Sequence, residues 1–158
     1  FDIEVAKKQD STNPVYYVQY AHARICSILR KAAGIELNDT PAEELAAAAV
    51  PVDVDLSVLT HPAELALMRK MDDFAELIEL AARDRAPFRL THYAEELAAA
   101  FHHFYTECRI MGEDAAVQNA RLALADSARI VLALTLSLLG VSAPVYMQPR
   151  EESQAETA

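Results

Sequence analysis

The segment that most constrains the fold spans residues 114–139, which contain neither glycine nor proline. Asp114 can cap a helix over this segment, and Gly140 is placed to end it. The second half of the helix is apolar nearly all round, a pattern that requires other helices packed about it. Its apolar run, residues 130–139, is much shorter than the roughly 18 to 20 residues that span a bilayer. We therefore expect a buried core helix, no membrane insertion, and an all-α helical bundle.

Start and stop signals predict a second long helix near the amino terminus. Asn13 can accept hydrogen bonds from the first turn, Pro14 suits the first helical position, and Gly34 can end the helix. The predicted helix covers residues 14–33. Its apolar residues share one stripe at helical spacing, which we expect to be buried: Val18, Ala21, Ile25, Ile28, Leu29 and Ala32.

Three shorter signals divide the middle of the chain. A capping box, Thr40 to Glu43, predicts a short helix over residues 41–49, and residues 52–58 are expected to be an extended linker, because a lone strand rarely persists. One helix is predicted from Pro62 to near Arg83, and another from Pro87. The apolar stripe of that last helix comprises Leu90, Ala94, Leu97, Phe101, Phe104, Tyr105 and Cys108.

Acidic residues are unevenly distributed along the chain. The 158 residues include 14 Lys plus Arg against 24 Asp plus Glu, a net charge of −10, which by itself disfavours nucleic-acid binding. However, residues 35–60 hold six acidic residues and no basic one, whereas residues 1–34 hold five basic and three acidic ones. We expect one bundle domain over residues 1–147, with an acidic linker-like stretch at 35–60 and a disordered acidic tail at 148–158. A basic patch can therefore exist despite the net charge.

The two cysteines, Cys26 and Cys108, cannot form a disulfide framework and suit the reducing cytoplasm. The chain begins with Phe1 rather than Met, so we expect it to be part of a longer product. No glycine-rich phosphate loop, CxxC pair or nucleophile elbow is present in the sequence. An enzyme acting alone therefore has no support.

Two clusters contain metal-ligand residue types. His22 and Cys26 lie four residues apart on one helix face, but structural zinc requires four ligands. We interpret this pair as a hydrogen-bonded histidine beside a core thiol. The second cluster is expected not to converge, because its cysteine lies on the apolar stripe and its histidines point elsewhere: His102, His103, Glu107 and Cys108.

Tyr17, Tyr20 and Arg24 form the most informative surface. They occupy positions i, i+3 and i+7 of the amino-terminal helix, beside its apolar stripe. Unpaired bases stack on tyrosine rings and on the arginine guanidinium plane, so this set suits single-stranded RNA. The alternative is that the tyrosines seal the edge of the core while the arginine extends to solvent.

The run NPVYYVQYAHARICSIL, residues 13–29, resembles the segment that opens the anticodon-binding domain of arginyl-tRNA synthetases, a class I family. The resemblance continues in order through residues 90–110, LTHYAEELAAAFHHFYTECRI, and through ARLAL at 120–124. It ends with LLGVSAP at 138–144, followed by Met147. The resemblance implies an all-helical bundle that binds the anticodon stem and loop of arginine tRNA.

The resemblance also implies roles for individual residues. Tyr17, Tyr20 and Arg24 would contact the anticodon, with Tyr105 and Met147 next to its bases. Arg109 and Arg121 would approach the RNA backbone.

The parent chain implied by the resemblance is an arginine–tRNA ligase that uses ATP with Mg²⁺ in a separate catalytic domain, absent here. This fragment would then have no catalysis or cofactor of its own. Its partners would be arginine tRNA and the catalytic domain of the same polypeptide, with no DNA and no membrane.

Two departures from the family pattern are evident. Residues 148–158 follow Met147, where family chains commonly end, and Val145–Tyr146 replaces the usual Glu-Arg pair. The acidic stretch at residues 35–58 is expected to face away from the tRNA. The alternative function is a helical protein–protein interaction module whose acidic linker and tail bind a basic partner.

Overall fold

The computed structural model describes residues 3–10 and 12–148, and every regular element in that part of the chain is helical. The predicted all-α fold is therefore confirmed. Within the same residues, no helix combines the length and hydropathy needed to cross a membrane. The predicted tail, apart from Gln148, lies outside the described residues. The elements are α1 (Ile3–Lys7), α2 (Pro14–Ala33), α3 (Ala42–Ala49), the 3₁₀ helix η1 (Leu56–Val58), α4 (Pro62–Asp72), α5 (Phe74–Arg83), α6 (Phe88–Glu107) and α7 (Ala115–Leu138).

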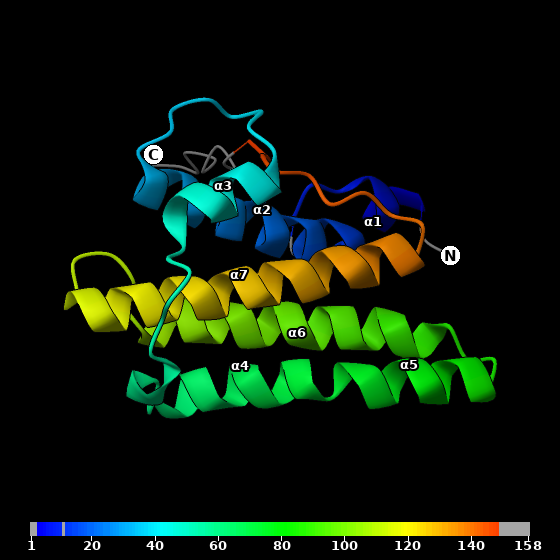
Figure 1. The fold of residues 1–158 in the computed structure, drawn as a ribbon. Helices are drawn as coiled ribbons and strands as arrows, with labels where there is room; N and C mark the ends of the chain where they lie inside the picture. The colour runs from blue at the N-terminus through cyan, green and yellow to red at the C-terminus, as the bar shows by residue number, and fades with distance from the viewer. Residues whose placement is uncertain (1–2, 11, 149–158) are drawn as a thin grey trace, which may run out of the picture.

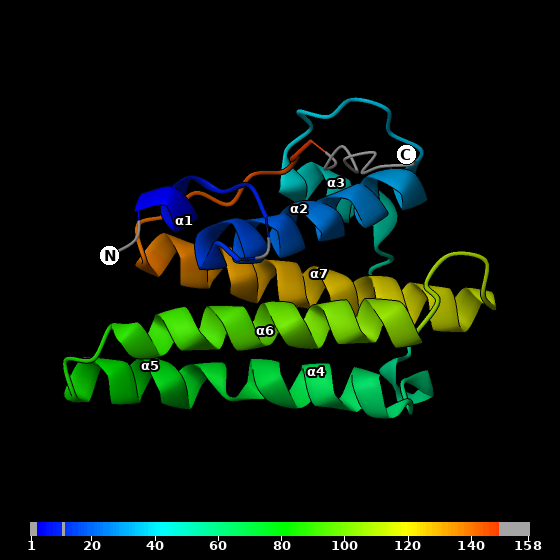
Figure 2. The ribbon, with the colours of Figure 1, turned by 180° about the vertical axis from the view of Figure 1, so that it is seen from behind.

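The helices are stacked in layers. In Figure 1, α4 and α5 lie end to end below α6, α7 lies above α6, and α2 with α3 covers α7. Figure 2 shows the same order from behind, with α2 crossing α6 and α7 at a shallow angle. The core lies between these layers, and Ile25, Leu29, Leu97, Phe101 and Leu132 are fully buried in it.

The caps of the long helices follow the sequence signals. The Asn13 side chain accepts from the amides of Val15 and Tyr16, and Gly34 adopts the left-handed conformation (φ 68°) that ends α2. The Asp114 side chain caps α7 by accepting from the Ala116 amide. The boundaries of α2 and α7 predicted from the sequence are therefore confirmed.

The middle of the chain differs from the prediction in three places. Thr40 does not cap α3; its hydroxyl donates to the Leu37 carbonyl, which also accepts from the buried Arg30 guanidinium, and Pro41 becomes the N-cap. Residues expected to be wholly extended contain η1, which the Asp55 carboxylate caps. The helix predicted from Pro62 to Arg83 is divided at Asp73, a poor helix former that nevertheless keeps helical angles, so α4 and α5 remain in line.

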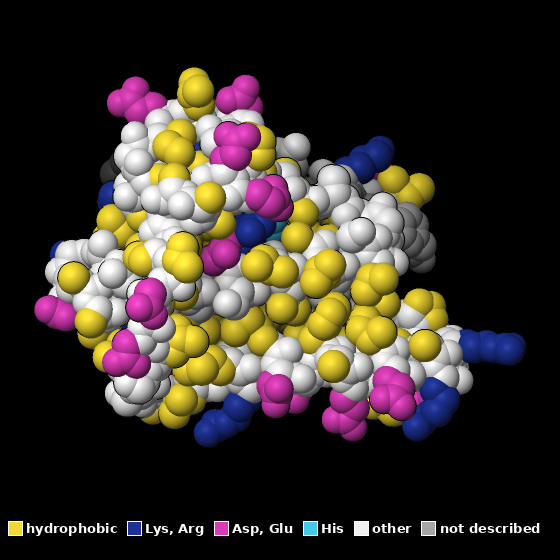
Figure 3. Space-filling model, in the orientation of Figure 1, with side chains coloured by type: hydrophobic (Ala, Val, Ile, Leu, Met, Phe, Trp, Pro, Cys, Tyr) yellow, Lys and Arg dark blue, Asp and Glu magenta, His cyan; other side chains and the backbone are white. Residues whose placement is uncertain are grey.

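The prediction that α7 is enclosed on all sides is wrong for its outer face. Ile130, Leu134 and Leu138 are 45%, 49% and 58% exposed. They recur every four residues, so they form one outward stripe opposite the face that packs on α2 and α6. Figure 3 shows hydrophobic side chains gathered across the middle of the molecule, over α7 and α6. The core therefore buries only part of the circumference of α7, although this helix is apolar nearly all round.

The carboxyl-terminal segment runs back along α2. After Gly140 (φ 72°) ends α7, Gln19 donates to the Ser142 carbonyl (2.9 Å) and the buried Arg30 donates to the Val145 carbonyl (3.2 Å). The ring of His22 bonds the Pro144 carbonyl at 2.9 Å. These three contacts place residues 146–148 beside the exposed side of α2.

Candidate nucleic-acid interface

The exposed side of α2 carries a row of aromatic side chains. The rings of Tyr16 and Tyr20, one helical turn apart, are nearly parallel (11°), with centroids 6.1 Å apart. Tyr17 points toward α6, where its ring lies 5.2 Å from that of His102, and Tyr20 lies 6.2 Å from the same imidazole. All three tyrosines are half-buried. The tyrosines are therefore accessible at one edge and packed at the other.

Arg24 lies between two tyrosine rings. Its guanidinium carbon is 5.4 Å from the Tyr20 ring centroid and 4.9 Å from that of Tyr105, which α6 supplies. Among the described residues, no carboxylate lies within ion-pair distance of Arg24. Cation–π attraction holds the guanidinium in place without using its N–H groups. Five N–H donors are thus available to a ligand.

His102 lies beneath this row and is neutral at physiological pH. Burial, together with the positive charge of Arg24, lowers the pKa of His102 from 6.5 to about 4. Burial also raises the pKa of the Tyr17 hydroxyl above its usual value. The His102 imidazole therefore acts as a packing surface for the tyrosines, and it adds no second positive charge beside Arg24.

Tyr20, Arg24 and Tyr105 line a cavity of about 320 Å³, which we call the Arg24 pocket. Tyr105 and Tyr146, each 38% exposed, form part of its wall. Met147 reaches the pocket because the carboxyl-terminal segment is hydrogen-bonded along α2. Among the described residues, the lining comprises Tyr20, Ala23, Arg24, Ser27, Ile28, Lys31, Tyr105, Tyr146 and Met147.

The candidate residues from the sequence divide into two groups. Tyr20, Arg24, Tyr105 and Met147 converge on the Arg24 pocket, although they come from three separate segments. Tyr17 lies next to the pocket, against His102 and the core, and does not line it. The buried stripe predicted for α6 includes Tyr105, and that part of the prediction is wrong, because Tyr105 is exposed.

Arg109 and Arg121 lie elsewhere: Arg109 lies in the turn between α6 and α7, and Arg121 lies near the start of α7. Arg121 donates from Nε to a carboxylate oxygen of Glu64 at 2.7 Å, and its side chain is only 14% exposed. Glu64 is 1% exposed, so this is a buried ion pair. Arg109 is exposed and donates to the Met111 carbonyl at 2.8 Å. The structure does not bring either arginine to the Arg24 pocket.

Both clusters of metal-ligand residue types have structural partners. The Cys26 thiol lies 3.9 Å from the His22 ring nitrogen, and burial raises the pKa of this thiol to about 11. His22 and Cys26 therefore pack and hydrogen-bond as predicted. Cys108 is buried, whereas His103 is exposed and His102 contacts the tyrosines of α2.

Sequence reasoning missed three residues of this surface. Tyr16 could have been found, because its spacing of four residues from Tyr20 predicts a ring contact on one helix face. Lys31 lies two turns beyond Arg24 on the same face and could have been found in the same way. Tyr146 had no local signal, because its place depends on how the carboxyl-terminal segment docks on α2.

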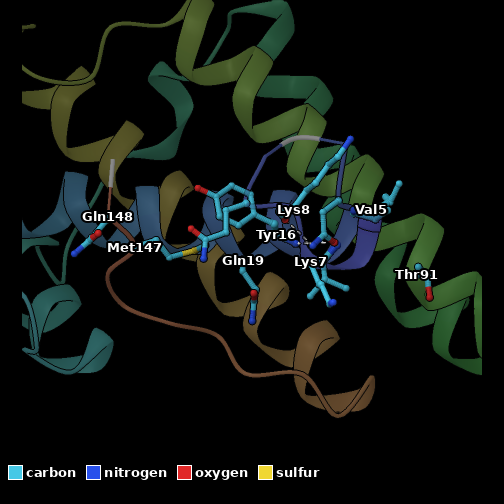
Figure 4. A pocket seen from close by; sticks show the side chains of 12 residues that line it. Val5, Lys7, Lys8, Tyr16, Gln19, Thr91, Met147 and Gln148 are labelled. Atoms are coloured by element: carbon cyan, nitrogen blue, oxygen red, sulfur yellow. Dashed lines mark hydrogen bonds between the residues drawn. The ribbon is translucent and has the colours of Figure 1, made fainter. Parts of the chain in front are cut away.

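A larger cavity of about 970 Å³, the Lys7 pocket, adjoins the Arg24 pocket and shares Met147 with it. In Figure 4, the Tyr16 side chain lies between Met147 and the lysines Lys7 and Lys8. The lining comprises Val5, Lys7, Lys8, Gln9, Asn13, Pro14, Val15, Tyr16, Gln19, Thr91, Met147 and Gln148. Neither pocket has a carboxylate among its described lining residues.

Comparison with known proteins identifies the family. Residues 18–147 match the DALR anticodon binding domain. Arginine–tRNA ligases of Heliobacterium modesticaldum and Dehalococcoides mccartyi are 47% and 48% identical to the chain over 147 residues, or 93% of its length. The match covers 25% and 24% of those two proteins, so the chain spans about a quarter of the length of these relatives.

Solved structures agree with the sequence match. The arginyl-tRNA synthetase of Thermus thermophilus matches with a TM-score of 0.73 and 33% identity, over 93% of this chain and 23% of that one. The putative arginyl-tRNA synthetase of Campylobacter jejuni also gives a TM-score of 0.73, with 30% identity over 93% of this chain and 29% of that one. The resemblance found in the sequence is therefore confirmed, and the chain belongs to the DALR anticodon-binding domain family.

Proposed function

We propose that this domain binds the anticodon stem and loop of arginine tRNA and positions it for aminoacylation by the catalytic domain of a longer arginine–tRNA ligase. The observation that carries the proposal is the composition of the Arg24 pocket. In a chain of net charge −10, this pocket is lined by two cations, three tyrosines and no carboxylate among its described residues. Such a lining suits unpaired bases next to phosphates.

Each group in the pocket has a distinct role in this proposal. The tyrosine rings offer faces to bases of the loop, and stacking on them is largely independent of sequence. Arg24 supplies hydrogen bonds, since its cation is already held between two rings and its N–H donors have no carboxylate partner among the described residues. Selection of arginine tRNA would therefore depend more on Arg24 than on the rings.

Tyr17, Arg109 and Arg121 have weaker support for contact with RNA. Tyr17 supports Tyr20 through their shared contact with His102. Arg121 is committed to Glu64, and the exposed Arg109 lies at the far turn of α6 and α7. We retain Tyr20, Arg24, Tyr105 and Met147 as the principal contacts.

The reaction itself belongs to the longer chain. ATP with Mg²⁺ would bind in the catalytic domain, as the relationship to arginine–tRNA ligases implies. Binding the anticodon here holds the tRNA in a fixed orientation, so the acceptor end meets that catalytic domain at high effective concentration. We place this function in the cytoplasm.

The test compares two labelled RNA hairpins by fluorescence anisotropy: the anticodon stem-loop of arginine tRNA and that of an unrelated tRNA. We expect Tyr20→Ala and Arg24→Ala each to weaken binding of the arginine hairpin by about 1 to 3 kcal/mol. Arg69→Ala, which removes an exposed arginine of α4, should leave binding nearly unchanged. Equal losses for both hairpins would show that these residues do not read the anticodon.

Absence of binding at micromolar RNA would instead favour the protein-interaction alternative. One observation supports that alternative: the exposed stripe of Ile130, Leu134 and Leu138 on α7. Exposed apolar stripes of this kind commonly contact other proteins. The hairpin measurement, made at two salt concentrations, separates the alternatives because binding to RNA phosphates weakens with salt.

A further inference from the structure

The Lys7 pocket, at about 970 Å³, is larger than the Arg24 pocket, and the anticodon proposal leaves it without a role. It is a continuation of the Arg24 pocket, because Met147 forms part of both walls. A ligand that fills the first cavity and extends past Met147 enters the second. The residues that line this second cavity indicate which kind of ligand it can hold.

One aromatic row connects the two cavities. The Tyr16 ring stacks on Tyr20 at 6.1 Å, Tyr20 lies against Arg24, and Arg24 lies against Tyr105. Tyr16 lines the Lys7 pocket and Tyr20 lines the Arg24 pocket. The stack therefore crosses the boundary between them, and Tyr16 can carry a planar group on the side of its ring away from Tyr20.

The charges of the Lys7 pocket are positive. Lys7 and Lys8 line it, and neither ammonium group lies within ion-pair distance of a carboxylate in the described part of the chain. Two of the amides that line the pocket have protein partners: Asn13 caps α2, and Gln19 donates to the Ser142 carbonyl. The two lysines and the Tyr16 ring are thus the charged and aromatic groups that line the pocket, beside the polar side chains of Gln9, Thr91 and Gln148.

Asn13 joins the backbone next to the two lysines to the helix that carries Tyr16. This residue is 8% exposed, and its amide nitrogen donates to the Lys8 carbonyl at 2.9 Å. Its oxygen accepts from the Val15 and Tyr16 amides. One side chain thereby joins the residue after α1 to the first turn of α2, so the backbone that carries the lysines lies next to that of Tyr16.

We infer that the Lys7 pocket is a second nucleotide site, which takes the loop nucleotide next to the bases held in the Arg24 pocket. The base stacks on Tyr16, its flanking phosphates face Lys7 and Lys8, and the Met147 thioether separates the two nucleotides. This inference rests on the proposed function, since it requires RNA in the first pocket. It extends the RNA path from α6, across α2, to α1.

The test is a double-mutant cycle between protein and RNA, read by anisotropy with the arginine anticodon stem-loop. The RNA change replaces one nucleotide at a time, on either side of the anticodon, by an abasic residue. We expect one abasic position to weaken binding of the unmodified protein about 5- to 150-fold, the range for one stacked base. Tyr16→Ala should lose a similar factor, and the same abasic RNA should then bind Tyr16→Ala with no further loss.

The second readout is salt dependence. Each phosphate contact on a single strand contributes about 0.7 to the slope of log K against log salt. The double variant Lys7→Ala/Lys8→Ala should therefore reduce the slope by about 1.4. The matched control Arg69→Ala/Arg85→Ala, which removes two cations of exposed residues elsewhere, should leave the slope unchanged. Thermal melts of Tyr16→Phe and Tyr16→Ala establish that each variant is folded.

The outcomes separate this inference from the anticodon proposal. If binding depends on Tyr20 and Arg24 but is unchanged in Tyr16→Ala and in the lysine double variant, the second site is overturned and the first remains. If no abasic position couples to Tyr16, the second site is also overturned. If the unmodified protein does not distinguish the arginine hairpin from an unrelated one, both proposals fail.

Discussion

Arg24 and Arg121 are both candidate RNA contacts in the sequence, yet they occupy opposite environments. Arg24 lies between two tyrosine rings, in a pocket open to solvent, with no carboxylate near it among the described residues. Arg121 is held by the buried Glu64 carboxylate, and its Nη1 donates to the Arg109 carbonyl. The partner of an arginine therefore decides whether its charge remains available to a ligand.

The difference between a ring partner and a carboxylate partner also determines what each arginine contributes to the free energies of binding and of folding. A ring partner takes up the face of the guanidinium and leaves its donors free, whereas a buried carboxylate takes up the donors. Breaking a buried ion pair leaves an uncompensated charge, whereas removing a half-exposed cation does not. Arg121 should therefore matter for stability and Arg24 for binding.

The largest expected effect is that of Arg121→Ala. Loss of this guanidinium leaves Glu64, which is 1% exposed, without its cation, and breaking a buried pair typically costs about 3 to 5 kcal/mol. Urea denaturation should show this loss, while the remaining folded protein binds the arginine hairpin with unchanged affinity. Glu64→Gln/Arg121→Ala should recover part of the stability, and a loss below about 1 kcal/mol would contradict the buried-pair account.

Arg24→Lys should have a smaller effect, confined to binding. Lysine keeps the positive charge but lacks the planar fork that fits between two rings and donates to a base edge. We expect hairpin affinity to fall by about 1 to 2 kcal/mol, with a change in unfolding free energy below about 1 kcal/mol. Affinity equal to that of the unmodified protein would show that only the charge matters, and the comparison with Arg121 would then lose its basis.

The pH dependence of stability should report the burial of His102 and, to a smaller extent, the positive charge of Arg24 beside it. Because the pKa of His102 is about 4 in the folded protein against 6.5 ordinarily, the unfolded chain binds the proton at higher pH. The contribution of His102 is complete above pH 6.5 and is lost as pH falls from there to about 4. We expect about 1 kcal/mol, discounted for partial solvent access.

The control for this effect lies on the same helix. His102→Gln should flatten the loss of stability in that pH window, whereas His103→Gln, at an exposed position, should not. By NMR, the pKa of His102 should rise in Arg24→Ala and remain unchanged in Arg121→Ala. A rise in both variants would show that the pKa responds to general loosening of the bundle.

The smallest expected effect is that of Arg109→Ala. Its exposed guanidinium donates only to the Met111 carbonyl among the described residues, and it lies outside both pockets. Unfolding free energy and hairpin affinity should each change by less than about 0.5 kcal/mol. If affinity falls as far as in Arg24→Lys, the RNA path includes the turn between α6 and α7, and the assignment of RNA to α2 is incomplete.

Local chemistry predicted the long helices α2, α6 and α7 and one face of the site. The caps of α2 and α7 depend on residues next to the helix ends, and the spacing of Tyr17, Tyr20 and Arg24 depends on α2 alone. The features that could not be predicted are contacts between residues that lie far apart in the sequence. Glu64 precedes Arg121 by 57 residues, and Tyr146 reaches the Arg24 pocket through contacts of the carboxyl-terminal segment with α2.

The outer face of α7 is a second case in which the local sequence does not predict a non-local property, here the extent of burial. Composition indicates that a helix is apolar all round, but it does not indicate how many neighbours the rest of the chain can supply. Here α2 and α6 cover one side of α7 and leave Ile130, Leu134 and Leu138 exposed. The extent of burial depends on the number of helices in the bundle, which is a property of the whole chain.

The most direct test of the central claim is an NMR titration of the isotope-labelled chain with the arginine anticodon stem-loop. The account predicts that the largest shift changes follow one surface: the exposed side of α2 from Tyr16 to Lys31, Tyr105 of α6, and Tyr146 and Met147. Shift changes concentrated at the turn around Arg109 and Arg121, or on the outer face of α7, would contradict it.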